Sequence, residues 1–263
     1  MSATTSSDVI ARRLAALRAE GRRALVIYVT AGHPTVDESI ALIRGLPTSG
    51  ADIIEVGVPF SDPLADGPVI QASSQQVLAA GMDFTGVLDI VARARAEAPT
   101  VLFSYLNPLL SAGPDALDRA ADAGASGLLV TDLPVGADPP LEARFGESPL
   151  AFIRLVAPTT PPARMAEIAR HGSGFVYLIS RLGVTGARAD VPAELPRTVA
   201  LLREATTLPI CVGFGISRPE QAAAVGRLAD GVAVGSAVVS AAAGGADRAL
   251  ELVRTLRAGL DAL

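Results

Sequence analysis

The stretch ADIIEVGVPFSDPLADGPV, residues 51–69, starts as a short apolar strand and continues as a loop rich in proline, glycine and carboxylates. Side chains alternate between the two faces of a strand. Ile54 and Val56 therefore share an apolar face that we expect to pack on helices, whereas Glu55 lies on the other face. A carboxylate among apolar neighbours is costly unless the site uses it. A strand that presents a carboxylate near its carboxyl end is typical of the active site of a barrel enzyme.

The rest of the chain repeats the order strand, loop, helix. A first helix is predicted to end at Gly21, a short one near Phe145, and another contains Pro219 with Ser217 as its N-cap. The other helices are predicted at 35–46, 71–80, 84–97, 115–123, 163–170, 194–205 and 246–261. Strands are predicted at 24–30, 52–57, 101–105, 127–132, 149–157, 174–180, 208–215 and 231–236. Residues 106–114 are predicted to form a loop.

Such alternation implies parallel strands joined by right-handed crossovers. Eight units within 263 residues favour a closed barrel over an open sheet. We therefore predict one α/β domain over 1–263, a (β/α)8 TIM barrel with an extra N-terminal helix and a short phosphate-binding helix after the eighth strand. Length alone also allows two smaller domains, but no linker divides the chain. A GxGxxG motif does not follow the first strand, which weakens a dinucleotide-binding interpretation.

Composition restricts the chemistry. The net charge of −5 argues against a nucleic-acid-binding surface. All 22 basic residues are arginine, so this chain has no lysine for a Schiff base, for anchoring pyridoxal phosphate or for a P-loop. The two histidines lack a metal-ligand spacing, and we expect no metal site. A single cysteine, Cys211, and a polar N-terminus without an apolar core segment suit the reducing cytoplasm.

Carboxylates are thus the main candidates for acid–base catalysis. Glu55 faces inward at the end of the second strand, and the alternative is a structural ion pair with an inward arginine. Asp66 lies on a loop long enough to fold back over the barrel mouth; alternatively, it is an ordinary turn residue in Ala-Asp-Gly. Asp62 is better explained as a turn or interface residue than as a catalyst.

Glycines follow the seventh and eighth strands, where barrels often bind phosphate through backbone N–H groups and a short helix. These positions are Gly213, Gly215, Gly235 and Ser236, with 237–244 as the short helix. The alternative is a pair of tight turns without a ligand. Residues 181–190, RLGVTGARAD, form either a lid that excludes water or a plain solvated loop. Tyr28 and Tyr177 either line the mouth or belong to the core.

Together these motifs resemble the tryptophan synthase alpha chain family. VGVPFSDPLADGP at 56–68, directly after Glu55, is long and specific. YVTAGHP at 28–34, TDLP at 131–134, SRLGVTGAR at 180–188, GFGIS at 213–217 and VGSAVV at 234–239 occur in the family's order. The resemblance covers essentially the whole chain.

The resemblance implies a TIM barrel that cleaves indole-3-glycerol phosphate to indole and glyceraldehyde 3-phosphate. It makes Glu55 the general acid/base, assigns Asp66 to the indole N–H group and places Tyr177 beside Glu55 as a third catalytic residue. Tyr28 stands where phenylalanine is often found. Residues implied to bind substrate are Tyr28, Thr185, Gly186, Gly213, Phe214, Gly215, Gly235 and Ser236.

The resemblance also implies a partner, the beta chain, which carries pyridoxal phosphate and receives the indole in an αββα heterotetramer. No cofactor is then expected on this chain. The implied interface residues are Asp62, Pro63, Asn107, Pro108 and Pro134. Two other functions remain as alternatives: a sugar-phosphate isomerase or epimerase on a phosphate-binding barrel, and a non-catalytic activator of the beta chain.

Overall fold

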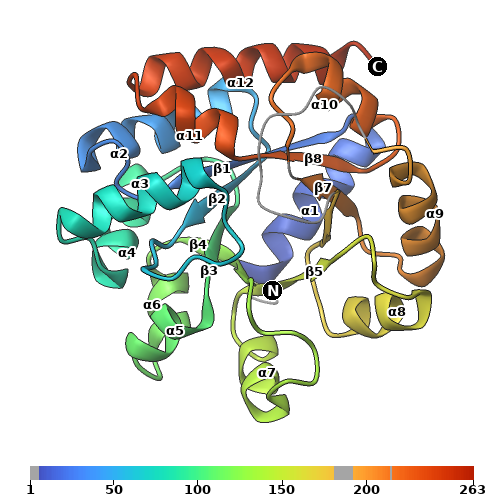
Figure 1. The fold of residues 1–263 in the computed structure, drawn as a ribbon, viewed down its shortest axis with the longest axis horizontal. Helices are drawn as coiled ribbons and strands as arrows, with labels where there is room; N and C mark the ends of the chain where they lie inside the picture. Colours follow the sequence, from blue (N-terminus) through green and yellow to red (C-terminus); the bar gives the residue numbers. More distant parts are fainter. Residues whose placement is uncertain (1–5, 181–191, 214) are drawn as a thin grey trace, which may run out of the picture.

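The predicted strands close into a ring. The computed structural model describes residues 6–180, 192–213 and 215–263. Each strand is parallel to both neighbours, and β1 pairs with β8 to complete the barrel (Figure 1). The strands are β1 (Ala24–Thr30), β2 (Ile53–Gly57), β3 (Thr100–Ser104), β4 (Ala125–Val130), β5 (Ala151–Val156), β6 (Val176–Ile179), β7 (Ile210–Gly213) and β8 (Gly231–Val234).

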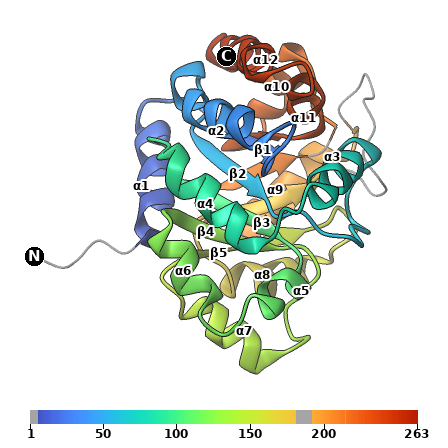
Figure 2. The ribbon, with the colours of Figure 1, turned by 90° about the vertical axis from the view of Figure 1, so that its left-hand side faces the viewer.

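Helices surround the barrel (Figures 1 and 2). They are α1 (Ser6–Ala19), α2 (Val36–Gly45), the 3-10 turn η1 (Pro47–Ser49), α3 (Pro68–Ala79), α4 (Phe84–Ala94), α5 (Leu106–Ser111), α6 (Ala116–Asp122), α7 (Pro139–Gly146), α8 (Pro162–Arg170), α9 (Leu195–Ala205), α10 (Pro219–Gly226), α11 (Ser236–Ala242) and α12 (Ala246–Asp261). Within the described ranges, no helix has the length and apolar character needed to cross a lipid bilayer.

The two faces of β2 pack as strand alternation predicts. Ile54 and Val56 belong to the large apolar cluster between the strands and the outer helices. Ile53 belongs instead to the smaller cluster inside the barrel, with residues such as Val101 and Ile153. Glu55 follows the orientation of Ile53, so its side chain lies on the interior side, near the carboxyl end of the strand.

Helix α1 closes the amino-terminal end of the barrel. Its residues Ile10, Leu14 and Leu17 are buried in the interior cluster, which confirms the predicted apolar spacing. Gly127 on β4 lies beneath this helix, and a Cβ there would be 2.7 Å from the Ile10 Cδ1 atom. Figure 2 shows α1 at the opposite end of the barrel from α3, so access to the interior is left to the carboxyl ends of the strands.

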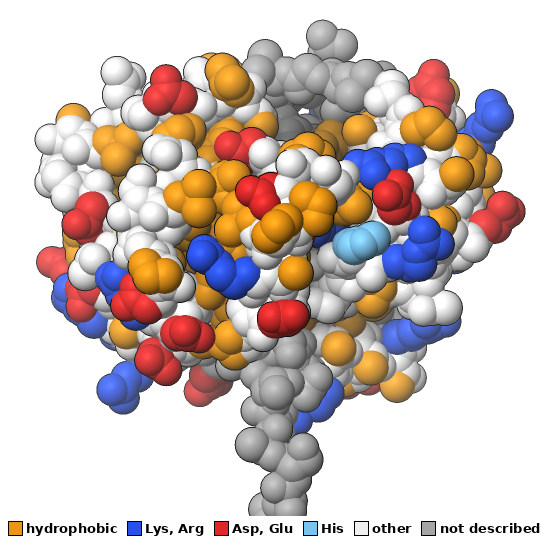
Figure 3. Space-filling model, turned by 90° about the horizontal axis from the view of Figure 1, so that it is seen from below, with side chains coloured by type: hydrophobic (Ala, Val, Ile, Leu, Met, Phe, Trp, Pro, Cys, Tyr) orange, Lys and Arg blue, Asp and Glu red, His pale blue; other side chains and the backbone are white. Residues whose placement is uncertain are grey.

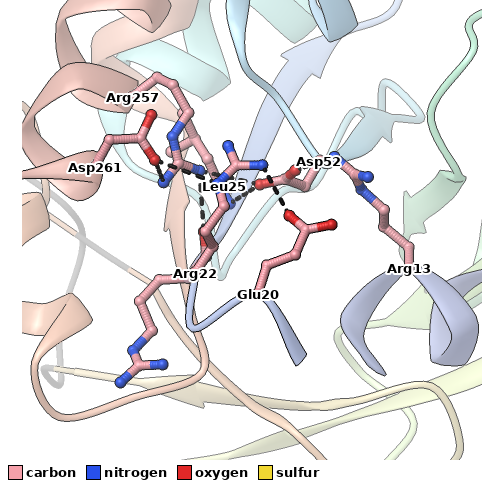
Figure 4. Close-up of polar contacts among 8 residues, drawn as sticks. Arg13, Glu20, Arg22, Leu25, Asp52, Arg257 and Asp261 are labelled. Atoms are coloured by element: carbon pink, nitrogen blue, oxygen red, sulfur yellow. Dashed lines mark hydrogen bonds and ion pairs between the residues drawn. The ribbon is translucent and has the colours of Figure 1, made fainter. Parts of the chain in front are cut away.

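A buried aspartate ties α1 and α12 to this closed end (Figure 4). Asp52, directly before β2, pairs with Arg13 of α1 through Oδ1. Its Oδ2 atom lies 3.2 Å from Nη1 of Arg257 on α12 and accepts the Leu25 backbone N–H at 2.8 Å. Arg257 also pairs with Asp261 at 2.7 Å. These groups lie far apart in the sequence, so only the fold brings them together.

Three local predictions were wrong. Residues 106–111, predicted as loop, form α5: its Leu106 N–H donates to Asp132 Oδ1 at 2.7 Å, and Pro108 lies in the first turn, where no N–H is required. The N-cap of α10 is Arg218 rather than Ser217, and Gln221 Oε1 accepts both of their backbone N–H groups. Strand β8 ends at Val234, so Ser236 begins α11. The other predicted element boundaries differ by a few residues at most.

Candidate active site

A cavity of about 280 Å³ opens at the carboxyl ends of the strands. Such mouths are where barrel enzymes place their active sites. Both candidate carboxylates line it, together with aromatic, apolar and small polar side chains. The lining residues are Tyr28, Glu55, Asp66, Gly67, Pro68, Val69, Ile70, Phe103, Tyr177, Gly215, Ile216, Ser217, Gly235, Ser236, Ala237 and Ser240.

Glu55 is almost completely enclosed, with 1% of its surface exposed. Its Oε1 atom has no hydrogen-bond partner among the described residues, and no arginine in those ranges forms an ion pair with it. Within that part of the chain, the structure does not support the alternative of a structural ion pair. Burial raises the pKa of Glu55 to about 8, because the charged form is poorly solvated. At neutral pH the group therefore holds a proton that it can donate.

Three aromatic rings form the wall beside Glu55. Phe103 on β3 packs edge-on against Tyr28, with ring centroids 5.4 Å apart, and against Tyr177, at 6.3 Å. Both tyrosines are buried and both line the cavity. The two interpretations offered by the sequence, a residue of the mouth and a residue of the core, therefore apply together. Sequence reasoning missed Phe103. The signal was available, because Phe103 is two residues beyond the inward-facing Val101 on the same strand.

Two glycines at strand ends make room for the tyrosine hydroxyl groups. A Cβ on Gly57 would lie 2.0 Å from the Tyr28 hydroxyl, and one on Gly213 would lie 2.0 Å from the Tyr177 hydroxyl. Gly213 ends β7 and is not among the residues that line the cavity. The contact that the structure gives Gly213 is therefore with Tyr177, and its predicted role in phosphate binding stays a prediction.

Asp66 reaches the same cavity from the loop after β2. Burial raises the pKa of its carboxyl group to about 6, and a hydrogen bond from Tyr105 opposes that rise. The Tyr105 hydroxyl also accepts the Ala65 N–H at 2.9 Å, and Gln71 Nε2 donates to the Asp66 carbonyl at 2.8 Å. Asp66 N–H donates to the Pro63 carbonyl, so the residue is also part of a turn. Tyr105, which the sequence did not single out, lies between β3 and α5 and binds this loop.

The predicted phosphate-binding positions line another part of the cavity, and a Cβ on Gly235 would lie 3.4 Å from the Tyr28 Cβ atom. Gly215, Gly235 and Ser236 line the cavity, and α11 starts at its edge. Gly215 has a φ of +81°, a backbone conformation that residues other than glycine rarely adopt. Ser217 and Ser240 add hydroxyl groups to the cavity lining and were not predicted. Thr185, Gly186, Phe214 and the predicted lid lie outside the described residues.

Comparison with known proteins identifies the family. The model of the family "Tryptophan synthase alpha chain" matches residues 14–260. The chain belongs to the tryptophan synthase alpha chain family. The alpha chain of Gluconacetobacter diazotrophicus is 49% identical over 235 residues, which cover 88% of this chain and 86% of that protein. The alpha chain of Caulobacter sp. strain K31 is 46% identical over 238 residues, covering 89% and 86%.

Solved structures of this family have the same fold. A tryptophan synthase structure from Mycobacterium tuberculosis superposes with a TM-score of 0.89 at 38% identity, over 95% of this chain and 97% of that chain. The alpha subunit from Legionella pneumophila gives a TM-score of 0.88 at 33% identity, over 99% and 100%. The fold and the family predicted from the sequence are thus confirmed.

The residues that the resemblance assigns to a partner interface lie on segments after β2, β3 and β4, around the cavity mouth. Asp62, Asn107 and Pro134 are exposed, and Pro63 and Pro108 are partly exposed. Two of these segments also expose leucines: Leu64 is 88% exposed and Leu110 47%.

Proposed function

We propose that this cavity cleaves indole-3-glycerol phosphate to indole and glyceraldehyde 3-phosphate, with Glu55 and Asp66 as its catalytic residues. The chain's family is a lyase family, and this is its reaction in tryptophan biosynthesis. The observation that supports the residue assignment most directly is that both carboxylates line one cavity and both have raised pKa values. Titratable groups whose pKa values differ within one site are suited to opposite acid–base roles.

The proposed reaction needs one proton donor and one acceptor. Protonated Glu55 delivers its proton to indole C3, which turns the ring into an electron sink. Glu55, now ionised, removes the proton of the glycerol hydroxyl beside the ring. The carbon–carbon bond then breaks, its electron pair restores the aromatic ring, and the side chain leaves as an aldehyde. Glu55 ends protonated, so protons balance without a lysine imine or a cofactor.

Asp66 has the complementary role in this proposal. Protonation at C3 places positive charge on the indole nitrogen, and an ionised carboxylate stabilises that charge through the N–H group. Its lower pKa, about 6 against about 8 for Glu55, keeps Asp66 ionised while Glu55 is protonated. Tyr177, Tyr28 and Phe103 supply an aromatic wall for the ring.

The substrate's phosphate is proposed to bind beside the glycines after β7 and β8. Gly215, Gly235 and Ser236 line the cavity there, and the amino-terminal end of α11 offers backbone dipoles to an anion. The sequence resemblance adds three further residues to the proposed phosphate site, namely Gly186, Gly213 and Phe214. Thr185 is proposed to approach Asp66.

We propose a beta chain as the partner, in an αββα heterotetramer, with pyridoxal phosphate on that chain. The exposed residues after β2, β3 and β4 would meet it, and indole would pass to it without entering bulk water. The direct test is indole release from indole-3-glycerol phosphate by the purified chain, measured with and without a beta chain. Release that requires this substrate supports the proposal, and no release under either condition contradicts it.

The alternatives predict different results. A sugar-phosphate isomerase or epimerase would need no indole pocket, so indole-propanol phosphate would not compete for its site. A non-catalytic activator would stimulate a beta chain equally well without Glu55. The raised pKa of Glu55 within a cavity that Asp66 shares favours the lyase over both.

The two carboxylates predict a bell-shaped pH dependence. We expect kcat/KM for indole release to rise as pH increases through about 6, where Asp66 loses its proton, and to fall through about 8, where Glu55 loses its own. Initial rates measured across this range test the expectation. The residual activity of Asp66→Asn should lack the acidic limb, and an unchanged limb would assign that titration to another group.

Adding a methyl group at Gly57 should damage the site without touching a carboxylate. The new Cβ would lie 2.0 Å from the Tyr28 hydroxyl and 2.4 Å from Cζ, so the ring must move. Because small misplacements in a site are costly, we expect kcat/KM to fall by roughly 10- to 100-fold in Gly57→Ala. Gly146→Ala is the matched control, since its Cβ would meet nothing within 4 Å. Equal activities of the two variants would contradict the packing argument.

A further inference from the structure

A second buried ion pair lies outside the active site, between the barrel and α7. Arg154 projects outward from β5 and is 4% exposed, and Glu142 of α7 is also buried. Arg154 Nη2 lies 2.6 Å from Glu142 Oε2. The guanidinium also stacks on Phe152, with Cζ 3.9 Å from the ring centroid. A buried ion pair often adds little stability compared with an apolar pair of similar size. The role of this pair is therefore better judged from the other contacts of its two side chains.

Most of those contacts go to the backbone of residues 131–138, the segment between β4 and α7. Arg154 Nη1 donates to the Leu133 carbonyl at 3.1 Å. Glu142 Oε1 accepts the Gly136 N–H at 2.7 Å and the Asp138 N–H at 3.4 Å. The third Arg154 nitrogen, Nε, donates to the carbonyl of His171, the residue that follows α8, at 3.1 Å. One ion pair thus holds the segment at several points.

Two side chains of this segment are buried: Leu133, which belongs to the large apolar cluster, and Val135. Two cavities, of about 490 and 320 Å³, adjoin it, and Val135 and Arg154 line both. Figure 3 views the molecule from the α7 side, where hydrophobic, acidic and basic side chains are intermingled. The hydrogen bonds from Arg154 and Glu142, together with one from Arg164 to the Val135 carbonyl, add directional contacts to the backbone between and beyond these apolar side chains.

The segment also belongs to the proposed partner face. It carries the exposed Pro134. Its Asp132 accepts the Leu106 N–H at 2.7 Å, which joins it to the start of α5. Helix α5 carries the exposed Asn107 and Leu110. A shift of residues 131–138 would therefore disturb two neighbouring parts of that face, while Glu55 and Asp66 lie on other elements.

We propose that the Arg154–Glu142 ion pair is a positioning device that holds residues 131–138 in the conformation that docks the beta chain. The inference rests on the proposed function for the identity of the partner. It adds that partner affinity depends on two buried side chains that need not touch the partner themselves. Binding to a preformed segment avoids the entropy loss of ordering it, so loosening the segment weakens the complex.

The test is the double variant Arg154→Met/Glu142→Leu, which removes both charges and leaves none buried alone. We expect its thermal stability and its indole release without partner to stay close to those of the original chain. The Kd for a purified beta chain, measured by titration calorimetry, should rise by about 10-fold or more. An unchanged Kd would overturn the inference.

The matched control is Arg257→Met, which breaks a buried ion pair of similar kind at the closed end of the barrel. It should lower the stability and leave the Kd for the beta chain unchanged at a temperature where it is folded. If it weakens binding as much as the double variant, general destabilisation explains the loss and the positioning role is wrong. Failure of the original chain to release indole or to bind a beta chain would instead refute the proposed function.

Discussion

Glu55→Gln is expected to lower indole release by about 10³-fold or more, since a group that carries both proton transfers is removed. Glutamine has nearly the same shape, and its amide protons are not acidic enough to be transferred to carbon. Glu55 Oε1 makes no hydrogen bond with the described residues, so the amide replaces few polar contacts. Single-turnover assays with indole-3-glycerol phosphate measure the loss directly. Circular dichroism should show an unchanged fold, and near-normal turnover would remove Glu55 from the mechanism.

The same variant should be more stable than the original chain at high pH. The pKa of Glu55 rises from 4.5 to about 8 on folding, so between these values the folded state binds more protons than the unfolded state. Stability from this group is therefore present at low pH and is lost progressively as pH rises to about 8. Glutamine does not titrate. The difference in unfolding free energy between variant and original should thus grow from pH 5 to pH 8 and then level off, as urea titrations would show.

Asp52→Ala is expected to be the most destabilising single change considered, by about 3–5 kcal/mol. It removes the carboxylate that faces Arg13 and Arg257 and accepts the Leu25 N–H. The buried Arg257 charge is then left with the half-exposed Asp261 as its acidic partner. The Nε atom of Arg257 already lacks a hydrogen-bond partner among the described residues. Urea-induced unfolding measures the loss, and fluorescence and circular dichroism should give coincident transitions.

Asp261→Ala is the control for this prediction. Asp261 pairs with Arg257 at 2.7 Å within the same network, but its side chain is 45% exposed. Exposed ion pairs contribute roughly 0–1 kcal/mol, so the control should cost no more than that. Comparable losses in the two variants would mean that burial of Asp52 does not set its importance.

The predictions for Asp52 and Glu55 concern opposite ends of the barrel. Asp52 directly precedes β2 and Glu55 lies within it, three positions further on. Yet Asp52 stabilises the closed end and Glu55 lines the open mouth. Destabilisation from Asp52→Ala should therefore leave the catalytic constants of the folded fraction nearly unchanged. Loss of Glu55 should do the opposite.

The two-residue period gives the inward orientation of Phe103, but the partners of the site residues depend on information that no local pattern carries. Phe103 and Tyr105 come from β3 and its end, yet one packs on both mouth tyrosines and the other binds the loop of Asp66. The contact between Gly213 and the Tyr177 hydroxyl depends on the pairing of β6 with β7. Register between strands decides such contacts, and it is set by closure of the whole barrel.

The amino-acid sequence by itself determined the strand–helix alternation, the inward orientation of Glu55 and the reliance on carboxylates in a chain without lysine. Those properties follow from a two-residue period and from composition, which are local. Only the tertiary structure decided that Asp66 and Glu55 share one cavity, that Asp52 meets Arg257 and that Arg154 meets Glu142. Each of these contacts joins separate elements of the chain. The elements come within contact distance only after the eight strands have closed into a barrel.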